Sequence, residues 1–259
     1  MNANECKLID SHCHIDVAAF DPDRGEVIAA ARNAGVCAMV VPGIHAEGWR
    51  GLLALCSSCA DLYPALGLHP VFLERHCDSH LAELEHLIEE TRPVAVGEIG
   101  LDFFRRDLDR ERQQALFEAQ LKFAAAADLP VLIHARKSHD QVLQALKRIR
   151  VPGGIAHAFS GSPQHARKYI ELGFKLGIGG MLTFERSTKL RVLARELPLE
   201  ALVLETDAPD MTVAAHRGER NSPEYLPDVL AALADARGED PAQVAMQTTR
   251  NARDLLSLR

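Results

Sequence analysis

The chain has 259 residues, of which 47% are hydrophobic and 25% are charged, and its formal net charge at pH 7 is −7. This composition is ordinary for a globular protein and excludes a largely disordered chain. The negative charge argues against broad nonspecific nucleic-acid binding, which depends on neutralising many phosphates with Lys and Arg. Residues 1–7 carry no basic-then-apolar export signal, and the six cysteines form no disulfide framework, so we expect a cytoplasmic protein.

Short apolar segments alternate with longer amphipathic segments along the whole chain. The apolar ones predict eight strands, over residues 7–14, 37–43, 63–69, 94–101, 130–135, 154–159, 174–179 and 202–206. The segments that read as helices include residues 25–34, 79–90, 110–127, 139–149, 163–172, 187–196, 223–237 and 241–256. Repeated strand–helix units form parallel sheets, and eight of them in a chain of this length favour a closed (β/α)8 TIM-type barrel. We therefore predict one α/β domain over residues 1–259, with no membrane span.

The first predicted strand ends in a pair of histidines. In barrels of this kind the carboxyl ends of the strands carry the chemistry. His12 and His14 are two residues apart in an extended segment, so both side chains should point the same way and bind one ion. Asp10 lies deeper on that face, where it could orient a ligand or a backbone group, or act directly.

Four later residues end other predicted strands and complete a candidate metal centre. Glu98 follows the fourth strand, where an unpaired buried carboxylate would be costly, and its two oxygens could bridge two ions. His134 and His157 end the fifth and sixth strands, and Asp207 follows the last. Asp207 could bind metal and also accept a proton from an attacking water. Such a mixed nitrogen and oxygen set suits one or two divalent ions, of zinc, manganese or magnesium.

Other residues near these strand ends are candidates for supporting roles. Glu205 shares the face of Asp207 one step deeper, and we expect it to support a metal ligand. His69, after the third strand, could donate to a substrate phosphate, complete the metal site or serve only in a turn. Three basic residues are expected to contact an anionic substrate, although each could instead be a solvated loop charge: Arg136, Lys137 and Arg220.

Six motifs taken together resemble one family. They are Ile-Asp-Ser-His-Cys-His, Gly-Glu-Ile-Gly-Leu-Asp, Ile-His-Ala-Arg, His-Ala-Phe-Ser-Gly and Glu-Thr-Asp-Ala-Pro, which begin at residues 9, 97, 133, 157 and 205, and the late Arg-Asn-Ser-Pro at 220–223. In this order they resemble the TatD family of metal-dependent hydrolases, in particular its YjjV-like branch. The resemblance implies a TIM-type barrel of the amidohydrolase-like group, activity on DNA phosphodiester bonds, and two divalent ions bound by His12, His14, Glu98, His134, His157 and Asp207.

The leading hypothesis is a divalent-metal-dependent deoxyribonuclease that acts as a 3′ exonuclease through an activated water. Its catalytic carboxylates would be Glu98 and Asp207, with Asp207 as the base. The sequence contains no helix-turn-helix or zinc-finger reader, which favours cleavage at exposed ends of DNA or another phosphodiester. Two alternatives stay open: hydrolysis of a small cyclic amide or ester at the same site, and a metal-stabilised binding protein without turnover. We expect a monomer.

Overall fold

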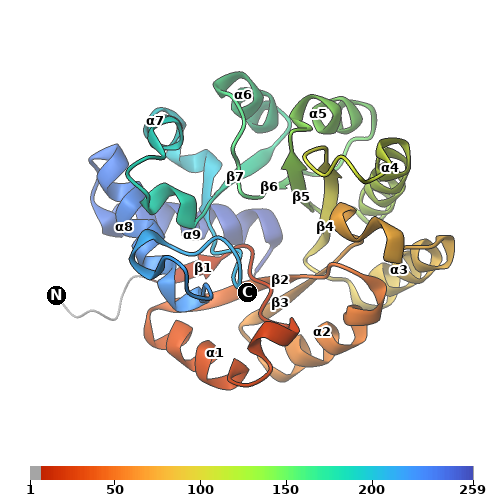
Figure 1. The fold of residues 1–259 in the computed structure, drawn as a ribbon, viewed down its shortest axis with the longest axis horizontal. Coiled ribbons are helices and arrows are strands. Elements are labelled where there is room, and N and C mark those ends of the chain that lie inside the picture. The colour runs from red at the N-terminus through yellow and green to blue at the C-terminus, as the bar shows by residue number, and fades with distance from the viewer. Residues whose placement is uncertain (1–6, 259) are drawn as a thin grey trace.

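The structure is a computed structural model of the chain, and it describes residues 7–258. Eight parallel strands form one sheet in which each strand pairs with the next along the chain (Figure 1). They are Leu8–Asp10 (β1), Val36–Pro42 (β2), Leu62–Leu66 (β3), Ala95–Asp102 (β4), Val131–Arg136 (β5), Gly154–Ala156 (β6), Phe174–Ile178 (β7) and Leu202–Leu204 (β8). The expectation that the chain has no export signal concerns residues 1–6, which lie outside the described residues.

Helices connect the strands and surround them, as expected for a (β/α)8 barrel (Figure 1). They are Arg24–Asn33 (α1), Ala46–Ser58 (α2), Asp78–Thr91 (α3), Arg110–Ala127 (α4), His139–Arg148 (α5), Pro163–Glu171 (α6), Thr188–Glu196 (α7), Leu226–Arg237 (α8) and Pro241–Leu256 (α9). The predicted barrel is confirmed. No helix within residues 7–258 combines the length and apolarity needed to cross a bilayer.

The first strand is shorter than predicted, because the chain leaves the sheet after Asp10. The Asp10 carboxylate accepts hydrogen bonds from the backbone N–H of His12 at 3.2 Å, and from the N–H and hydroxyl of Thr206 at 3.0 and 2.5 Å. Ser11 donates its backbone N–H to the carbonyl of Leu204. These contacts join β1 to β8 and close the barrel. His12 and His14 therefore follow the strand rather than share a face of it.

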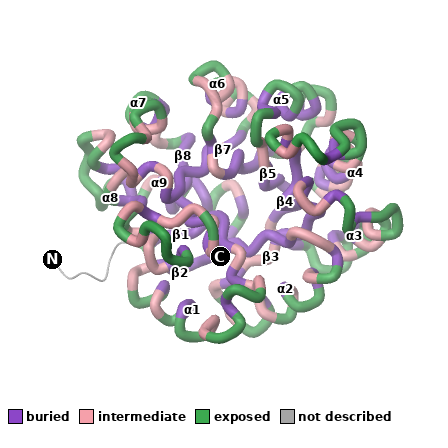
Figure 2. The backbone as a smooth tube through the Cα atoms, in the orientation of Figure 1, coloured by how far each residue is buried: buried purple, intermediate pink, exposed green. Residues whose placement is uncertain are grey.

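The barrel interior below the site is apolar. Seven strands contribute one or two inward side chains each, and these form a buried cluster with the C-terminal segment: Ile9, Ala38, Val40, Ala65, Ala95, Leu132, Ile155, Val203, Ala252, Leu256 and Leu258. Helix α9 thus covers the end of the barrel opposite the carboxyl ends of the strands. Figure 2 shows the buried strands inside a ring of helices whose outer faces are exposed.

Alternation along the strands places the candidate residues directly above this cluster. Side chains two apart in a strand share a face. His134 follows the inward Leu132 by two residues, and His157 follows Ile155 in the same way. The same spacing brings polar side chains from several strands together at one end of the barrel.

Candidate metal centre

A cavity of about 630 Å³ opens at the carboxyl ends of the strands. Seven of the residues singled out from the sequence line it: His14, His69, Glu98, His134, Arg136, His157 and Asp207. His12 is fully buried beneath them. These side chains therefore lie together at one end of the barrel, as their positions at the ends of the predicted strands indicated.

The first group of donors consists of His12, His14 and Glu98. The Nε2 atoms of the two histidines are 3.2 Å apart, and they lie 3.1 and 3.4 Å from Oε2 of Glu98. A tetrahedral zinc ion with Zn–N distances of about 2.0–2.1 Å places its ligand atoms about 3.3 Å apart. The spacing in this group fits one small divalent ion.

A second group uses the other oxygen of Glu98. Oε1 lies 3.1 Å from Nδ1 of His134 and 3.2 Å from Nε2 of His69. The two oxygens of one carboxylate therefore face two different pairs of imidazoles. A carboxylate that is shared by two ions faces ligands on both oxygens, and His134 is the candidate ligand on the Oε1 side.

Asp207 lies beside the first group. Its Oδ1 is 3.5 Å from Nε2 of His14, 3.7 Å from Nε2 of His12 and 3.5 Å from Nε2 of His157. The Asp207 backbone adopts a left-handed conformation (φ 59°) and donates its N–H to the carbonyl of His12. The loop after β8 is thus tied to the segment after β1, and the carboxylate is aimed at the histidines.

Three of the histidines have one ring nitrogen occupied by an outer partner. Nδ1 of His14 lies 3.1 Å from the carbonyl of Pro42, and Nε2 of His134 lies 3.1 Å from Oδ2 of Asp102. A carbonyl or carboxylate oxygen takes an N–H, so in a neutral imidazole the other nitrogen carries a lone pair. In His14 and His134 that lone pair faces a carboxylate, an arrangement that a bound cation stabilises.

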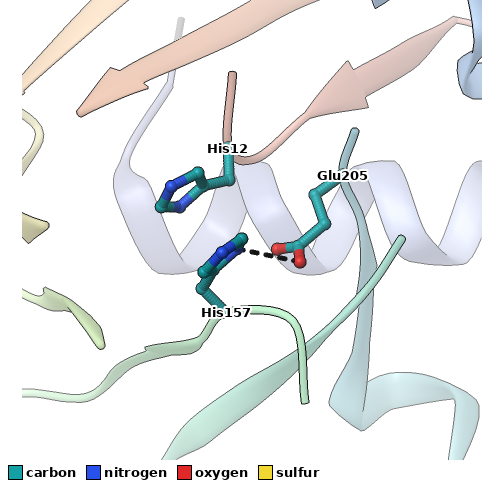
Figure 3. A group of neighbouring side chains, drawn as sticks. All are labelled: His12, His157 and Glu205. Atoms are coloured by element: carbon teal, nitrogen blue, oxygen red, sulfur yellow. Dashed lines mark ion pairs between the residues drawn. The ribbon is translucent and has the colours of Figure 1, made fainter. Parts of the chain in front are cut away.

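His157 has Glu205 as its outer partner, in a close ion-pair contact (Figure 3). Its Nδ1 lies 2.9 Å from Oε1 of Glu205, which also accepts the backbone N–H of Ala158 at 2.6 Å. The His157 ring stacks on that of His12, with centroids 3.7 Å apart. Glu205 therefore supports a candidate ligand, and Nε2 of His157 is left to face Asp207.

His69 differs from the other histidines in its hydrogen bonding. Its Nδ1 accepts the backbone N–H of Val71 at 3.2 Å, so in the neutral ring the proton is on Nε2. Burial lowers the pKa of His69 to about 4, which keeps the ring neutral near pH 7. An Nε2–H pointing into the cavity is a hydrogen-bond donor to Glu98 or to a substrate oxygen, rather than a metal ligand.

The carboxylates of the centre are held ionised. Burial raises the pKa of Glu98, but the surrounding imidazoles, which include His12 and His134 in hydrogen bonds to the carboxylate, outweigh this effect and hold it well below its usual range. Burial likewise opposes ionisation of Asp207, and the imidazoles of His157, His14 and His12 hold its pKa well below the usual range. Metal ligands must be deprotonated, so both carboxylates are in the state that a cation needs.

Asp10 lies outside this cluster. Its oxygens contact backbone groups and the hydroxyl of Thr206, and burial raises its pKa to about 7. Of the two roles left open by the sequence, the contacts favour orientation of the segment that carries His12.

Asp102 is more important to the site than the sequence indicated. Its Oδ1 caps the following loop by accepting the N–H groups of Phe104 and Arg105. Its Oδ2 contacts His134, which the sequence did not indicate. The signal was available, since Asp102 ends a strand four residues after Glu98 and is as buried as the core.

The three basic residues have different surroundings. Arg136 lines the cavity. Lys137 is exposed, at a left-handed turn (φ 58°) that leads toward α5, and it does not line the cavity. Arg220 forms a two-point ion pair with Asp23 at 2.9 and 2.6 Å, and its guanidinium lies over Phe20. Of the three, Arg136 is the one that lines the cavity.

Gly177 in β7 makes room for the Glu205 carboxylate. A Cβ at this position would lie 2.1 Å from Oε2 of Glu205. We expect Gly177→Ala to push Glu205 away from His157, to destabilise the fold by about 1–3 kcal/mol through overpacking, and to weaken metal binding about 10- to 100-fold. Thermal unfolding and metal titration measure the two effects. Gly51→Ala is the matched control, since a Cβ there has no neighbour within 4 Å; equal behaviour of the two variants would contradict the assigned role of Glu205.

Comparisons with known proteins agree with this geometry. A family described as TatD related DNase matches residues 9–257. The chain is 43% identical to the metal-dependent hydrolase YjjV of Escherichia coli, over 98% of this chain and 99% of that protein. The crystal structure of that protein superposes with a TM-score of 0.95 and covers 98% of this chain and 99% of that one.

A protein named as a 3′-5′ ssDNA/RNA exonuclease TatD, from Klebsiella pneumoniae, is 34% identical over 97% of this chain and 98% of its own length. The family match spans nearly all described residues and includes each strand end that contributes to the centre. The chain therefore belongs to the TatD family of metal-dependent hydrolases.

Proposed function

We propose that this protein hydrolyses phosphodiester bonds at the 3′ end of single-stranded nucleic acid, with two divalent ions in the centre described above. The observation that carries the proposal is the arrangement around Glu98, whose two oxygens face different imidazoles. The names of its relatives support the substrate class, since several are called 3′-5′ ssDNA/RNA exonucleases.

Two sets of residues would bind the ions. His12, His14, Glu98 and Asp207 surround one position, and Glu98 and His134 face the other. His157 lies beside Asp207 and would be a further ligand. Zinc, manganese and magnesium all remain candidates for such a donor set. When bound, divalent ions supply Lewis acidity toward a phosphoryl oxygen and lower the pKa of water.

The residues of the chain have separate tasks in this reaction. Asp207 is the base that accepts the proton of the attacking water, because its carboxylate borders the cavity beside the candidate metal ligands. His69 donates from Nε2 to a phosphate oxygen, and Arg136 faces the anionic strand from the cavity wall. Glu205 and Asp102 keep their histidines oriented.

A cytoplasmic location and a monomeric state are part of the proposal. The free thiols of Cys13, Cys37, Cys56, Cys59 and Cys77 support a reducing compartment.

The experiment is a substrate panel with purified, metal-loaded protein. It contains end-labelled single-stranded DNA and RNA, the matching duplexes, and small cyclic amides and esters. We expect shortening of single strands from the 3′ end and little action on blunt duplex. Turnover of a cyclic amide or ester without any cleavage of oligonucleotides would contradict the proposal and favour the small-molecule alternative.

A further inference from the structure

An aromatic ring projects from the rim of the cavity next to Arg136. Phe104 is 54% exposed, in the loop between β4 and α4. The guanidinium carbon of Arg136 lies 3.8 Å from the centre of its ring. We call this pair the Phe104–Arg136 shelf. Arg136 lines the cavity and Phe104 does not, so the shelf leads from the cavity to its outer edge.

The exposure of Phe104 is unusual for this chain. Among residues 7–258, the large apolar side chains that are clearly exposed are Phe104, Val192 and Met246, and Phe104 is the aromatic one. Solvent exposure of a whole aromatic ring forfeits the burial that normally stabilises it. The other aromatics of the neighbouring loops differ, since Phe159 is buried and Phe103 is packed against the core.

The backbone that carries the ring is anchored beside the metal centre. The backbone N–H groups of Phe104 and Arg105 both donate to Oδ1 of Asp102, at 3.0 and 3.1 Å. The other oxygen of the same buried carboxylate contacts His134. Asp102 therefore connects the backbone of Phe104 to a candidate metal ligand, and the Phe104–Arg136 shelf is structurally continuous with the metal centre.

The charge of Arg136 is available to a ligand. No carboxylate within residues 7–258 lies within 4.0 Å of its guanidinium, whereas Arg105 pairs with Asp107 and Arg220 with Asp23. A guanidinium stacked on an aromatic ring keeps its N–H edges free for hydrogen bonds. The β4–β5 side of the rim thus offers a flat apolar face and an unpaired cation side by side.

We propose that the Phe104–Arg136 shelf binds an unpaired nucleobase of the substrate strand, just outside the cavity that takes the terminal nucleotide. The base stacks on the open part of the Phe104 ring, and Arg136 donates to the adjoining phosphate. This inference rests on the proposed function, which supplies a nucleic-acid strand. A base can stack there only when it is unpaired and unstacked from its neighbours, so the shelf selects single strands over duplex.

The test measures binding rather than turnover. A nuclease-resistant phosphorothioate strand carries one 2-aminopurine, placed in turn at each of the nucleotides near the 3′ end, and is titrated with the metal-loaded protein. Stacking on an aromatic ring quenches 2-aminopurine fluorescence. We expect quenching at one position near the end. We also expect Phe104→Ala to abolish this quenching and to weaken binding about ten-fold, the effect of losing one base–aromatic stack.

Two variants and one strand serve as controls. Phe104→Tyr keeps the ring and should restore both quenching and affinity. Met246→Ala removes an exposed apolar side chain from α9, which covers the other end of the barrel, and should change neither. A strand that lacks the base at the quenched position should bind equally well to the wild type and to Phe104→Ala.

The outcomes separate this inference from the proposed function. If Phe104→Ala binds and quenches as Met246→Ala does, the shelf is not a base site, even when the wild type cleaves oligonucleotides. If the quenching depends on Phe104 but the wild type cleaves no phosphodiester, the shelf stands and the proposed function is wrong. If the wild type binds no strand, both are overturned.

Discussion

Replacing Glu98 with alanine is expected to remove both ions from the centre and to lower hydrolysis by at least about a thousand-fold. The reason is that each oxygen of Glu98 faces a different group of imidazoles, so one substitution takes a ligand from both positions. Loss of metal-ion catalysis costs several kcal/mol of transition-state stabilisation. A loss of about 1.4 kcal/mol slows the reaction ten-fold. Elemental analysis and turnover of a labelled strand measure the two effects.

The controls for this substitution address folding and specificity. Glu98→Gln keeps the size of the side chain and one carbonyl oxygen, so it should fold and bind fewer ions than the wild type. Glu89→Ala removes an exposed carboxylate from α3 and should leave metal content and activity unchanged. Full metal content in a folded Glu98→Ala protein would show that Glu98 does not bridge the two positions.

The second large effect concerns Asp207. Asp207→Asn retains the shape of the side chain but loses the charge that would bind metal and accept a proton. We expect turnover to fall roughly 10²- to 10⁴-fold, the range for loss of a general base. The fold should be retained, because the link from this loop to the segment after β1 is a backbone hydrogen bond, from Asp207 N–H to the carbonyl of His12.

Turnover at saturating substrate and metal, together with thermal unfolding, checks this prediction. Asp254→Asn, an exposed carboxylate on α9, is the matched control. Turnover of Asp207→Asn close to that of the wild type would assign the proton transfer to another group.

The barrel and its polar end could be predicted from the sequence because both depend on short-range patterns. Eight apolar segments alternate with amphipathic ones, and an alternation of two along a strand places His134 above Leu132 and His157 above Ile155. The carboxyl ends of parallel strands meet at one end of a barrel, so residues far apart in sequence were expected together. The structure brings His12, His14, Glu98, His134, His157 and Asp207 together in this way.

Features that depend on long-range side-chain contacts could not be predicted. The early end of β1 results from hydrogen bonds between Asp10 and Thr206, which are far apart in the chain. The hydrogen bond that Nδ1 of His69 accepts from Val71 is local, but it depends on the shape of one turn that no sequence pattern indicated. Arg220 was expected to contact the substrate because it follows β8, and the structure shows that its guanidinium forms an ion pair with Asp23. The spacing of residues in the sequence predicts which side chains lie at the carboxyl ends of the strands. Their contacts in the folded protein determine which of them face the cavity.

The most direct test of a two-ion phosphodiesterase is a metal titration of chelator-treated protein, followed by its activity on an end-labelled single strand. The geometry around Glu98 predicts that activity rises until two equivalents of divalent ion are bound per chain and disappears again with excess chelator. Undiminished cleavage in the presence of chelator, or full activity with a single equivalent bound, would contradict the account.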